Sequence, residues 1–169
     1  AIAEVFNKMI DQLERFNEQI KELTIIDEVT KLYNDKHYIN SLDEAISRAG
    51  KYNHLVSLIL MELDGFGDFV RGNDKIITDK NLEAFARIIK SNLGAADFAA
   101  RCEGNRFAVI LIETNKKEAF AAVNRVRNSL DHYLFEQSSG GARKFTLSCG
   151  LAVFPVDAKK RAELDKCAN

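Results

Sequence analysis

The segment Phe98-Ala-Ala-Arg-Cys-Glu-Gly-Asn-Arg-Phe-Ala-Val-Ile-Leu-Ile112 has the clearest strand-turn-strand pattern in the chain. Two apolar runs flank a polar turn in which Gly104 is followed by Asn105. Glycine and asparagine tolerate the backbone conformations that a tight turn between antiparallel strands requires. The stretch therefore predicts a β-hairpin, with strands over residues 98–102 and 106–112.

The rest of the chain alternates between strand and helix patterns. Leu55-Val-Ser-Leu-Ile-Leu-Met-Glu-Leu63 is nearly all apolar, as expected of a central strand that is covered on both faces, and residues 145–154 predict a further strand. Helical spacing of apolar residues is found over residues 38–49, 76–93 and 118–134 and again from residue 161. We therefore expect an α/β (α+β) domain with a mixed sheet flanked by helices.

The composition excludes several classes of function. With 24 basic and 25 acidic residues the net charge is −1, which gives no basic footprint for nucleic acid. The longest apolar run has the length of a strand, so we expect no membrane contact by this fragment. The three cysteines lack the spacing of a metal site, and a reduced, cytoplasmic setting explains them best.

The first residues predict a long amphipathic helix. Its apolar positions alternate spacings of four and three, as in a coiled-coil seam: Ile2, Phe6, Met9, Leu13, Phe16, Ile20 and Leu23. Two such helices would pair in parallel and make a homodimer, and we expect the helix to connect to an upstream sensor domain in the same protein. The alternative is a helix that lies on its own domain.

Acidic residues mark the end of the predicted central strand. Glu62 and Asp64 lie two residues apart and therefore on one face of the strand. Ligands of open α/β sheets bind at that edge, and two carboxylates there could hold Mg²⁺ against a nucleotide phosphate. A solvated strand end explains the pair equally well.

Five segments resemble, in order, the motifs of the GGDEF family, the bacterial diguanylate cyclases. They are Asp27-Glu-Val-Thr-Lys-Leu-Tyr-Asn34, Met61-Glu-Leu-Asp-Gly-Phe-Gly67, Asp79-Lys-Asn-Leu82, Arg101-Cys-Glu-Gly-Asn-Arg-Phe-Ala-Val-Ile-Leu111 and Cys149-Gly-Leu-Ala-Val-Phe-Pro155. The resemblance implies a fold like that of nucleotide cyclases and polymerase palms. It divides the chain into a signalling, coiled-coil helix over residues 1–26 and a GGDEF-like domain over residues 27–169, truncated in its last helix.

The resemblance also implies a chemistry and a metal site. Members of the family condense two GTP molecules to cyclic di-GMP by metal-assisted attack of a ribose hydroxyl on an α-phosphate. The metal ligands map onto Glu62, the backbone carbonyl of Leu63 and Asp64. Glu62 is still an acid but is one methylene longer than the aspartate of the family.

The signature hairpin departs from the family pattern. It maps onto Glu103, Gly104, Asn105, Arg106 and Phe107, where Glu103 replaces a glycine and Asn105 replaces an acidic metal ligand. Arg106 replaces a glutamate, which reverses a charge beside the metal site. At an effective dielectric constant of about 20, two unit charges 4 Å apart interact by about 4 kcal/mol, so the reversal should weaken Mg²⁺ binding by about two decades or more. We expect Arg106 to form an ion pair with Glu62 or Asp64 and to fill the metal site.

Two further family sites are incomplete. The phosphate-binding lysine and the guanine-reading asparagine map onto Gly67 and Val70, whereas the acid Asp79 is kept. The resemblance thus leaves Asp79, Gly104 and Asn105 as a vestigial nucleotide site. The arginine of the product-inhibition motif is missing at Gly94, which leaves Asp97 and, on a later helix, Arg125.

Three interpretations follow. The first is a regulatory or dimerisation module of a bacterial cyclic di-GMP signalling protein, catalytically inactive and without a cofactor. The second is a sensor that binds GTP without turnover. The third is a residual diguanylate cyclase that uses Glu62 and Asp64. Mg²⁺ is expected as a cofactor only if the chain retains some nucleotide binding.

Overall fold

The computed structural model describes the backbone of residues 1–169 and the side chains of residues 1–20 and 23–169. Its elements, in chain order, are α1 (Ile2–Leu23), α2 (Asp35–Tyr52), β1 (Val56–Leu63), α3 (Phe66–Gly72), α4 (Lys75–Ser91), β2 (Phe98–Arg101), β3 (Arg106–Ile112), α5 (Lys116–Asp131), β4 (Phe135–Glu136), β5 (Ala142–Arg143), β6 (Leu147–Phe154) and α6 (Arg161–Ala168).

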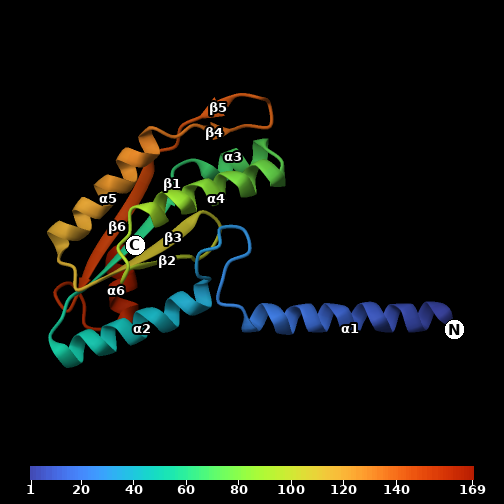
Figure 1. Ribbon diagram of the computed structural model, residues 1–169, viewed down its shortest axis with the longest axis horizontal. Helices are drawn as coiled ribbons and strands as arrows, with labels where there is room; N and C mark the ends of the chain where they lie inside the picture. The colour runs from blue at the N-terminus through green and yellow to red at the C-terminus, as the bar shows by residue number, and fades with distance from the viewer.

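A four-stranded sheet with the order β2-β3-β1-β6 forms the centre of the domain. Neighbouring strands of this sheet are antiparallel, and an isolated parallel bridge joins Tyr33 to Ala100 at the β2 edge. Helices α4 and α5 lie on one side of the sheet, and α2 and α6 lie on the other (Figure 1). The α/β (α+β) class with a sheet flanked by helices is thus confirmed, while the paired strands are antiparallel where a mixed sheet was expected.

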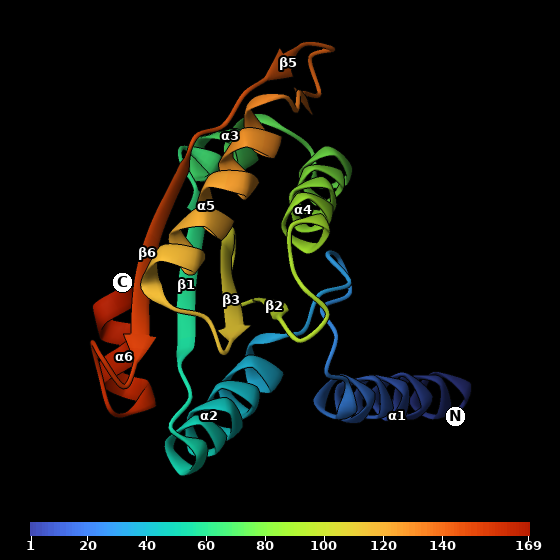
Figure 2. The ribbon, with the colours of Figure 1, turned by 60° about the vertical axis from the view of Figure 1, so that its left-hand side comes forward.

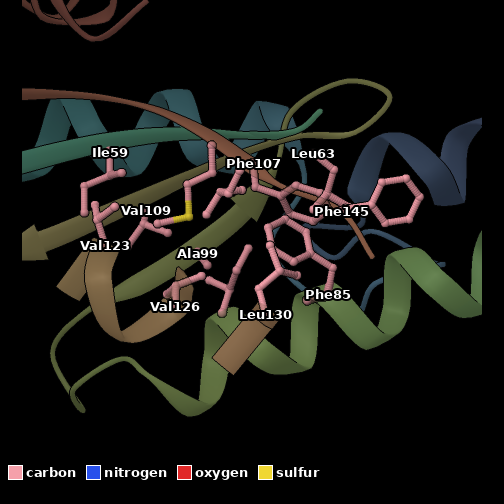
Figure 3. Packing of buried hydrophobic residues seen from close by; sticks show 14 of the residues in the cluster. Ile59, Leu63, Phe85, Ala99, Phe107, Val109, Val123, Val126, Leu130 and Phe145 are labelled. Atoms are coloured by element: carbon pink, nitrogen blue, oxygen red, sulfur yellow. The ribbon is translucent and has the colours of Figure 1, made fainter. Parts of the chain in front are cut away.

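Strand β1 has buried residues on both faces because helices cover both sides of the sheet. Ile59 and Leu63 point into the larger cluster of apolar side chains, together with Phe85 of α4 and Val126 of α5 (Figure 3). Phe85 packs edge-on against Phe107 of β3, with ring centroids 5.0 Å apart. This core holds the C-terminal end of β1 against the hairpin of β2 and β3.

Short polar side chains begin the helices that surround the sheet. Asn34 starts α2, and its side chain accepts a hydrogen bond from the backbone of His37. Asn115 and Glu118 form a reciprocal capping box at the start of α5. Asp74 caps α4, which explains why this helix begins at Lys75, one residue before its apolar pattern.

Two elements were not expected from the sequence. The short helix α3 follows β1 directly, since Phe66 and Phe69 are three residues apart and both are buried. Strands β4 and β5 form a small hairpin in a segment for which the sequence predicts neither a helix nor a strand. Lys80 and Asn81 of α4 bind Glu136 of β4, so contacts with α4 hold this hairpin in place.

Helix α1 leaves the body of the domain and points away from it (Figure 1; Figure 2). Its apolar side chains are exposed; Phe6 is 61% exposed and Phe16 is 60% exposed. The alternative of a helix that lies on its own domain is therefore wrong for this structure, while pairing as a coiled coil stays a prediction. Within the described part of the chain, no helix is both long and apolar enough to cross a lipid bilayer.

Candidate functional site

Three segments meet at one end of the sheet: the end of β1, the tip of the β2–β3 hairpin and the start of β6. The strand register places Glu62 directly opposite Arg106 on one side and Ser148 on the other. Because directly opposite residues of antiparallel strands share a face, these three side chains lie on the same side of the sheet. Glu62 and Arg106, two of the residues that the sequence predicts as a site, are thus brought together.

Asp64 is held by two hydroxyl groups. The hydroxyls of Thr146 and Ser148 each donate to one of its carboxylate oxygens at 2.6 Å. The backbone N–H of Asp64 also donates to the Thr146 carbonyl at 2.9 Å. The hydrogen bonds from Ser148 and then Thr146 lower the pKa of the Asp64 carboxyl below its ordinary value. Nothing in the sequence motifs pointed to these two hydroxyls.

The carbonyl of Leu63 accepts a hydrogen bond from the hairpin tip. The Asn105 side-chain amide donates to it at 2.8 Å, across a separation of 42 residues in the chain. An aspartate at this position, when ionised, has no proton to donate, so this bond depends on the amide. It joins two positions that the resemblance assigns to metal binding.

The hairpin tip is a closed turn. The Cys102 N–H donates to the Arg106 carbonyl, and the Arg106 N–H donates to the Glu103 carbonyl, both at 2.9 Å. Gly104 has a φ of +58°, in the left-handed region that favours glycine, and a Cβ built there meets no atom within 4 Å. The backbone conformation thus explains the retained glycine without a ligand.

Arg106 does not form the expected ion pair. Its side chain is exposed. Among the described residues, every ion pair with an N–O distance of up to 4.0 Å joins other residues, so the guanidinium of Arg106 pairs with neither Glu62 nor Asp64. The reason is geometric: Asp64 already accepts two hydroxyl donors, and Glu62 and Arg106 both have long side chains that reach water. Arg106, Glu62 and Ser148 instead line a shallow hollow of about 170 Å³.

Arg101 connects the hairpin tip to the segment that follows α1. Its Nε donates to the Gly104 carbonyl at 2.9 Å, and its Nη1 lies 3.3 Å from Oδ1 of Asp27. Burial acts to raise the pKa of Asp27, but the side-chain and backbone hydrogen bonds of Thr30, together with the charge of Arg101, lower it overall. The first motif of the chain and the signature hairpin are therefore in direct contact.

The positions expected to contact a nucleotide are spread over three elements: Asp79 lies on α4, Gly67 and Val70 lie on α3, and residues 104 and 105 lie at the hairpin tip. Asp79 is half-buried and forms an ion pair with Lys75, one turn earlier on α4. Gly67 faces open space, since a Cβ there meets nothing within 4 Å, and Val70 is 43% exposed. The sequence motifs did not identify Lys75 as the partner of the retained acid.

The residues of the expected inhibitory site are engaged in local contacts. The two carboxylate oxygens of Asp97 accept from the backbone N–H groups of Gly94 at 3.0 Å and Ile112 at 3.1 Å. Arg125 donates to the carbonyl of Asn92 at 3.4 Å. A side chain at position 94 would approach Asp97 Oδ2 at 3.0 Å, so the glycine allows this tight loop.

Comparison with known proteins defines the class. The family model described as "Diguanylate cyclase, GGDEF domain" matches residues 24–169, and the chain belongs to this family. Diguanylate cyclase A of Treponema denticola is 29% identical over 156 residues, which cover 90% of this chain and 42% of the relative. The chain thus spans less than half the length of this curated relative.

Solved structures agree with the fold. The GGDEF domain of FimX from Pseudomonas aeruginosa superposes with a TM-score of 0.80 and 25% identity, covering 86% of this chain and 90% of that one. The coiled coil and GGDEF domain of DgcB from Caulobacter crescentus, in complex with c-di-GMP, gives a TM-score of 0.79 and 21% identity, covering 96% of this chain and 85% of that one. At the latter identity the likeness concerns the fold alone.

Proposed function

We propose that this chain is a catalytically inactive GGDEF domain that acts as a regulatory and dimerisation module of a bacterial cyclic di-GMP signalling protein. In this proposal residues 1–26 are the signalling helix, which pairs with a second copy and receives its input from an upstream sensor domain. Residues 27–169 are the GGDEF-like domain. Three free cysteines agree with the reduced, cytoplasmic setting that we propose for it.

The observation that carries the proposal is the hydrogen bond from Asn105 to the Leu63 carbonyl. Mg²⁺ binds oxygen ligands at about 2.0–2.1 Å in octahedral geometry. An amide donor 2.8 Å from that carbonyl competes for the oxygen on which a metal would depend. Each carboxylate oxygen of the neighbouring acid, Asp64, already accepts a hydrogen bond from a hydroxyl group. The donor set therefore does not fit the metal ions that the family uses.

The local charge supports the same conclusion. Arg106 stands directly opposite Glu62 in the strand register, at the place where the family carries a second acid. A positive charge there repels a divalent cation by an amount of the order of 8 kcal/mol at 4 Å and an effective dielectric constant of about 20, twice the value for two unit charges. The charge and the hydrogen bonds each oppose metal binding.

A route for regulation is supported by Arg101. It touches Asp27, at the entry of the chain into the domain, and the Gly104 carbonyl, at the hairpin tip. A displacement of α1 that moves Asp27 would therefore act on the hairpin through one side chain. A module of this kind transmits the position of a helix without turnover of a nucleotide.

The second candidate is a GTP sensor without turnover, which the retained Asp79 favours. The ion pair of Asp79 with Lys75 and the donation by Asn105 to the protein backbone oppose it, because both groups would have to exchange their partners for the nucleotide. The third candidate, a residual diguanylate cyclase using Glu62 and Asp64, requires metal ions at a site with the wrong charge.

Isothermal titration of the purified chain with GTP and Mg²⁺ tests the proposal. The inactive module predicts no binding heat. Micromolar binding that is lost in Asp79→Ala would establish the sensor in its place. The matched control is Asp68→Ala, since Asp68 is an exposed acid on the neighbouring α3 that pairs with Arg71.

A further inference from the structure

Helix α1 ends beside the start of α2 and leads away from the body of the domain (Figure 1; Figure 2). Every described side chain of α1, in residues 2–20 and at residue 23, is exposed. The burial of these side chains therefore does not hold α1 in place. Its direction depends on the turn of residues 24–34 that connects it to α2, which we call the joint.

Asn34 closes the joint with hydrogen bonds to both helices. Its side-chain amide donates to the carbonyl of Thr24, the residue directly after α1, at 2.7 Å. Its backbone N–H donates to the carbonyl of Ile25 at 2.9 Å. Its side-chain oxygen accepts from the N–H of His37 at 2.9 Å and so caps α2. One side chain thus binds the end of α1 and the first turn of α2.

The contact of Asn34 is with the end of the helix itself. The N–H of Thr24 donates to the carbonyl of Ile20 at 3.1 Å, so the helical hydrogen bonding of α1 extends to residue 24. The last carbonyls of a helix have no partner within the helix. The amide of Asn34 supplies a donor to one of them, and the end of α1 is therefore fastened to the cap of α2.

Asn34 is itself fixed to the sheet through the residue before it. The N–H of Tyr33 donates to the carbonyl of Ala99 at 3.2 Å, and the carbonyl of Tyr33 accepts from the N–H of Arg101 at 2.9 Å. The ring of Tyr33 also packs against that of His37, with ring centroids 4.4 Å apart. The joint therefore fastens α1 to an element whose position is set by strand β2 and by α2.

The two roles of the Asn34 side chain have different chemical requirements. The cap of α2 needs only an acceptor, and aspartate caps a helix about as well as asparagine. The contact with Thr24 needs a donor, and an ionised carboxylate has no proton to donate. An amide satisfies both, so replacement of Asn34 by aspartate separates the contact with α1 from the cap.

We propose that Asn34 is a positioning residue, which fixes the direction of α1 relative to α2 and the central sheet. A shift of α1 then reaches α2 through Asn34, in addition to the route from Asp27 to Arg101. This inference rests on the proposed role of α1 as the signalling helix, and it names the residue through which the position of that helix acts on the domain.

Residual dipolar couplings of backbone N–H groups, measured by NMR on the whole chain without nucleotide, test the proposal. In the unmodified chain, the couplings of α1 and of the central sheet should fit one common alignment. Asn34→Asp removes the donor to Thr24 and keeps the cap, so the common alignment should be lost and the couplings of α1 should decrease. Asn34→Ala removes both contacts and should also lower the melting temperature.

The matched control is Asn115→Asp at the start of α5. It makes the same replacement at a residue whose side-chain oxygen caps a helix by accepting from the N–H of Glu118. The common alignment of α1 and the sheet should therefore persist in this variant. Asn34 is not among the residues of either apolar core, so its substitution leaves the packing of the domain intact, which melting curves verify.

The outcomes distinguish this inference from the proposed function. A common alignment that persists in Asn34→Asp would overturn the positioning role. A separate alignment of α1 in the unmodified chain, or an equal loss in Asn115→Asp, would overturn it as well. Binding of GTP in the titration would instead overturn the inactive module and leave the positioning role of Asn34 standing, because the couplings are measured without nucleotide.

Discussion

The side-chain amide of Asn105 donates a hydrogen bond to the backbone carbonyl of Leu63 at 2.8 Å, and so joins the tip of the signature hairpin to the end of the central strand. In this position the hairpin stabilises the strand end with its own donor, where the family pattern has an acid that binds metal. A single change, from a carboxylate to an amide, thus turns an acceptor for a cation into a donor for a carbonyl.

Restoring the acids should restore metal binding. The double substitution Asn105→Asp with Arg106→Glu removes the donor to Leu63 and replaces a positive charge with a negative one beside Glu62. We expect the affinity for Mg²⁺, measured by titration calorimetry, to rise by about a hundredfold or more. Asn40→Asp with Arg48→Glu, at exposed positions on α2, changes the net charge by the same amount and should leave the affinity unchanged. An unaltered affinity in the double variant would show that these two residues do not exclude the metal.

Loss of Arg101 should destabilise the domain. Arg101→Ala removes the donor to the Gly104 carbonyl and the cationic partner of the half-buried Asp27, which should cost about 1–3 kcal/mol in the free energy of unfolding, measured with urea. Arg87→Ala removes an exposed pair with Glu83 on α4 and should cost less than about 0.5 kcal/mol. Equal effects of the two substitutions would argue against a structural connection through Arg101.

Asp64 should titrate below its ordinary pKa of 3.8. Because the folded pKa is the lower one, its hydrogen bonds stabilise the fold above the unfolded pKa, and this contribution disappears as the pH falls through the folded pKa. Thr146→Val with Ser148→Ala should raise the pKa of Asp64, as followed by carboxyl-carbon NMR. A pKa that stays low in this variant would mean that the two hydroxyls are not its cause.

Two glycines should respond in opposite ways to alanine. A Cβ at Gly150 of β6 would overlap the backbone of Ala168 in α6, so Gly150→Ala should displace α6 and lower the free energy of unfolding by about 1–3 kcal/mol. Gly67 lies in α3 with open space around it, so Gly67→Ala should be neutral or stabilise by up to about 1 kcal/mol. Thermal unfolding of both variants measures the difference. A harmless alanine at position 150 would contradict the close packing of α6 on β6.

The central strand and the hairpin of β2 and β3 could be predicted from the sequence, because continuous apolar runs and a Gly-Asn turn are local signals. The short helix α3 and the β4–β5 hairpin were not predicted, since each depends on tertiary contacts such as that of Asn81 with Glu136. For the site, the sequence motifs predicted Glu62, Asp64 and Asn105 as candidate functional residues. Their actual partners follow from strand register and side-chain direction: Thr146 lies 82 residues from Asp64 in the chain. The expected ion pair of Arg106 was wrong for the same reason, because charge alone does not specify where a flexible side chain points.

Overnight incubation of the chain with GTP and Mg²⁺, followed by chromatography for cyclic di-GMP, tests whether the site is catalytically inactive. A site in which Asn105 donates a hydrogen bond to the Leu63 carbonyl and Arg106 lies opposite Glu62 should yield no product. Formation of cyclic di-GMP above a protein-free control, abolished in Glu62→Gln, would contradict the account.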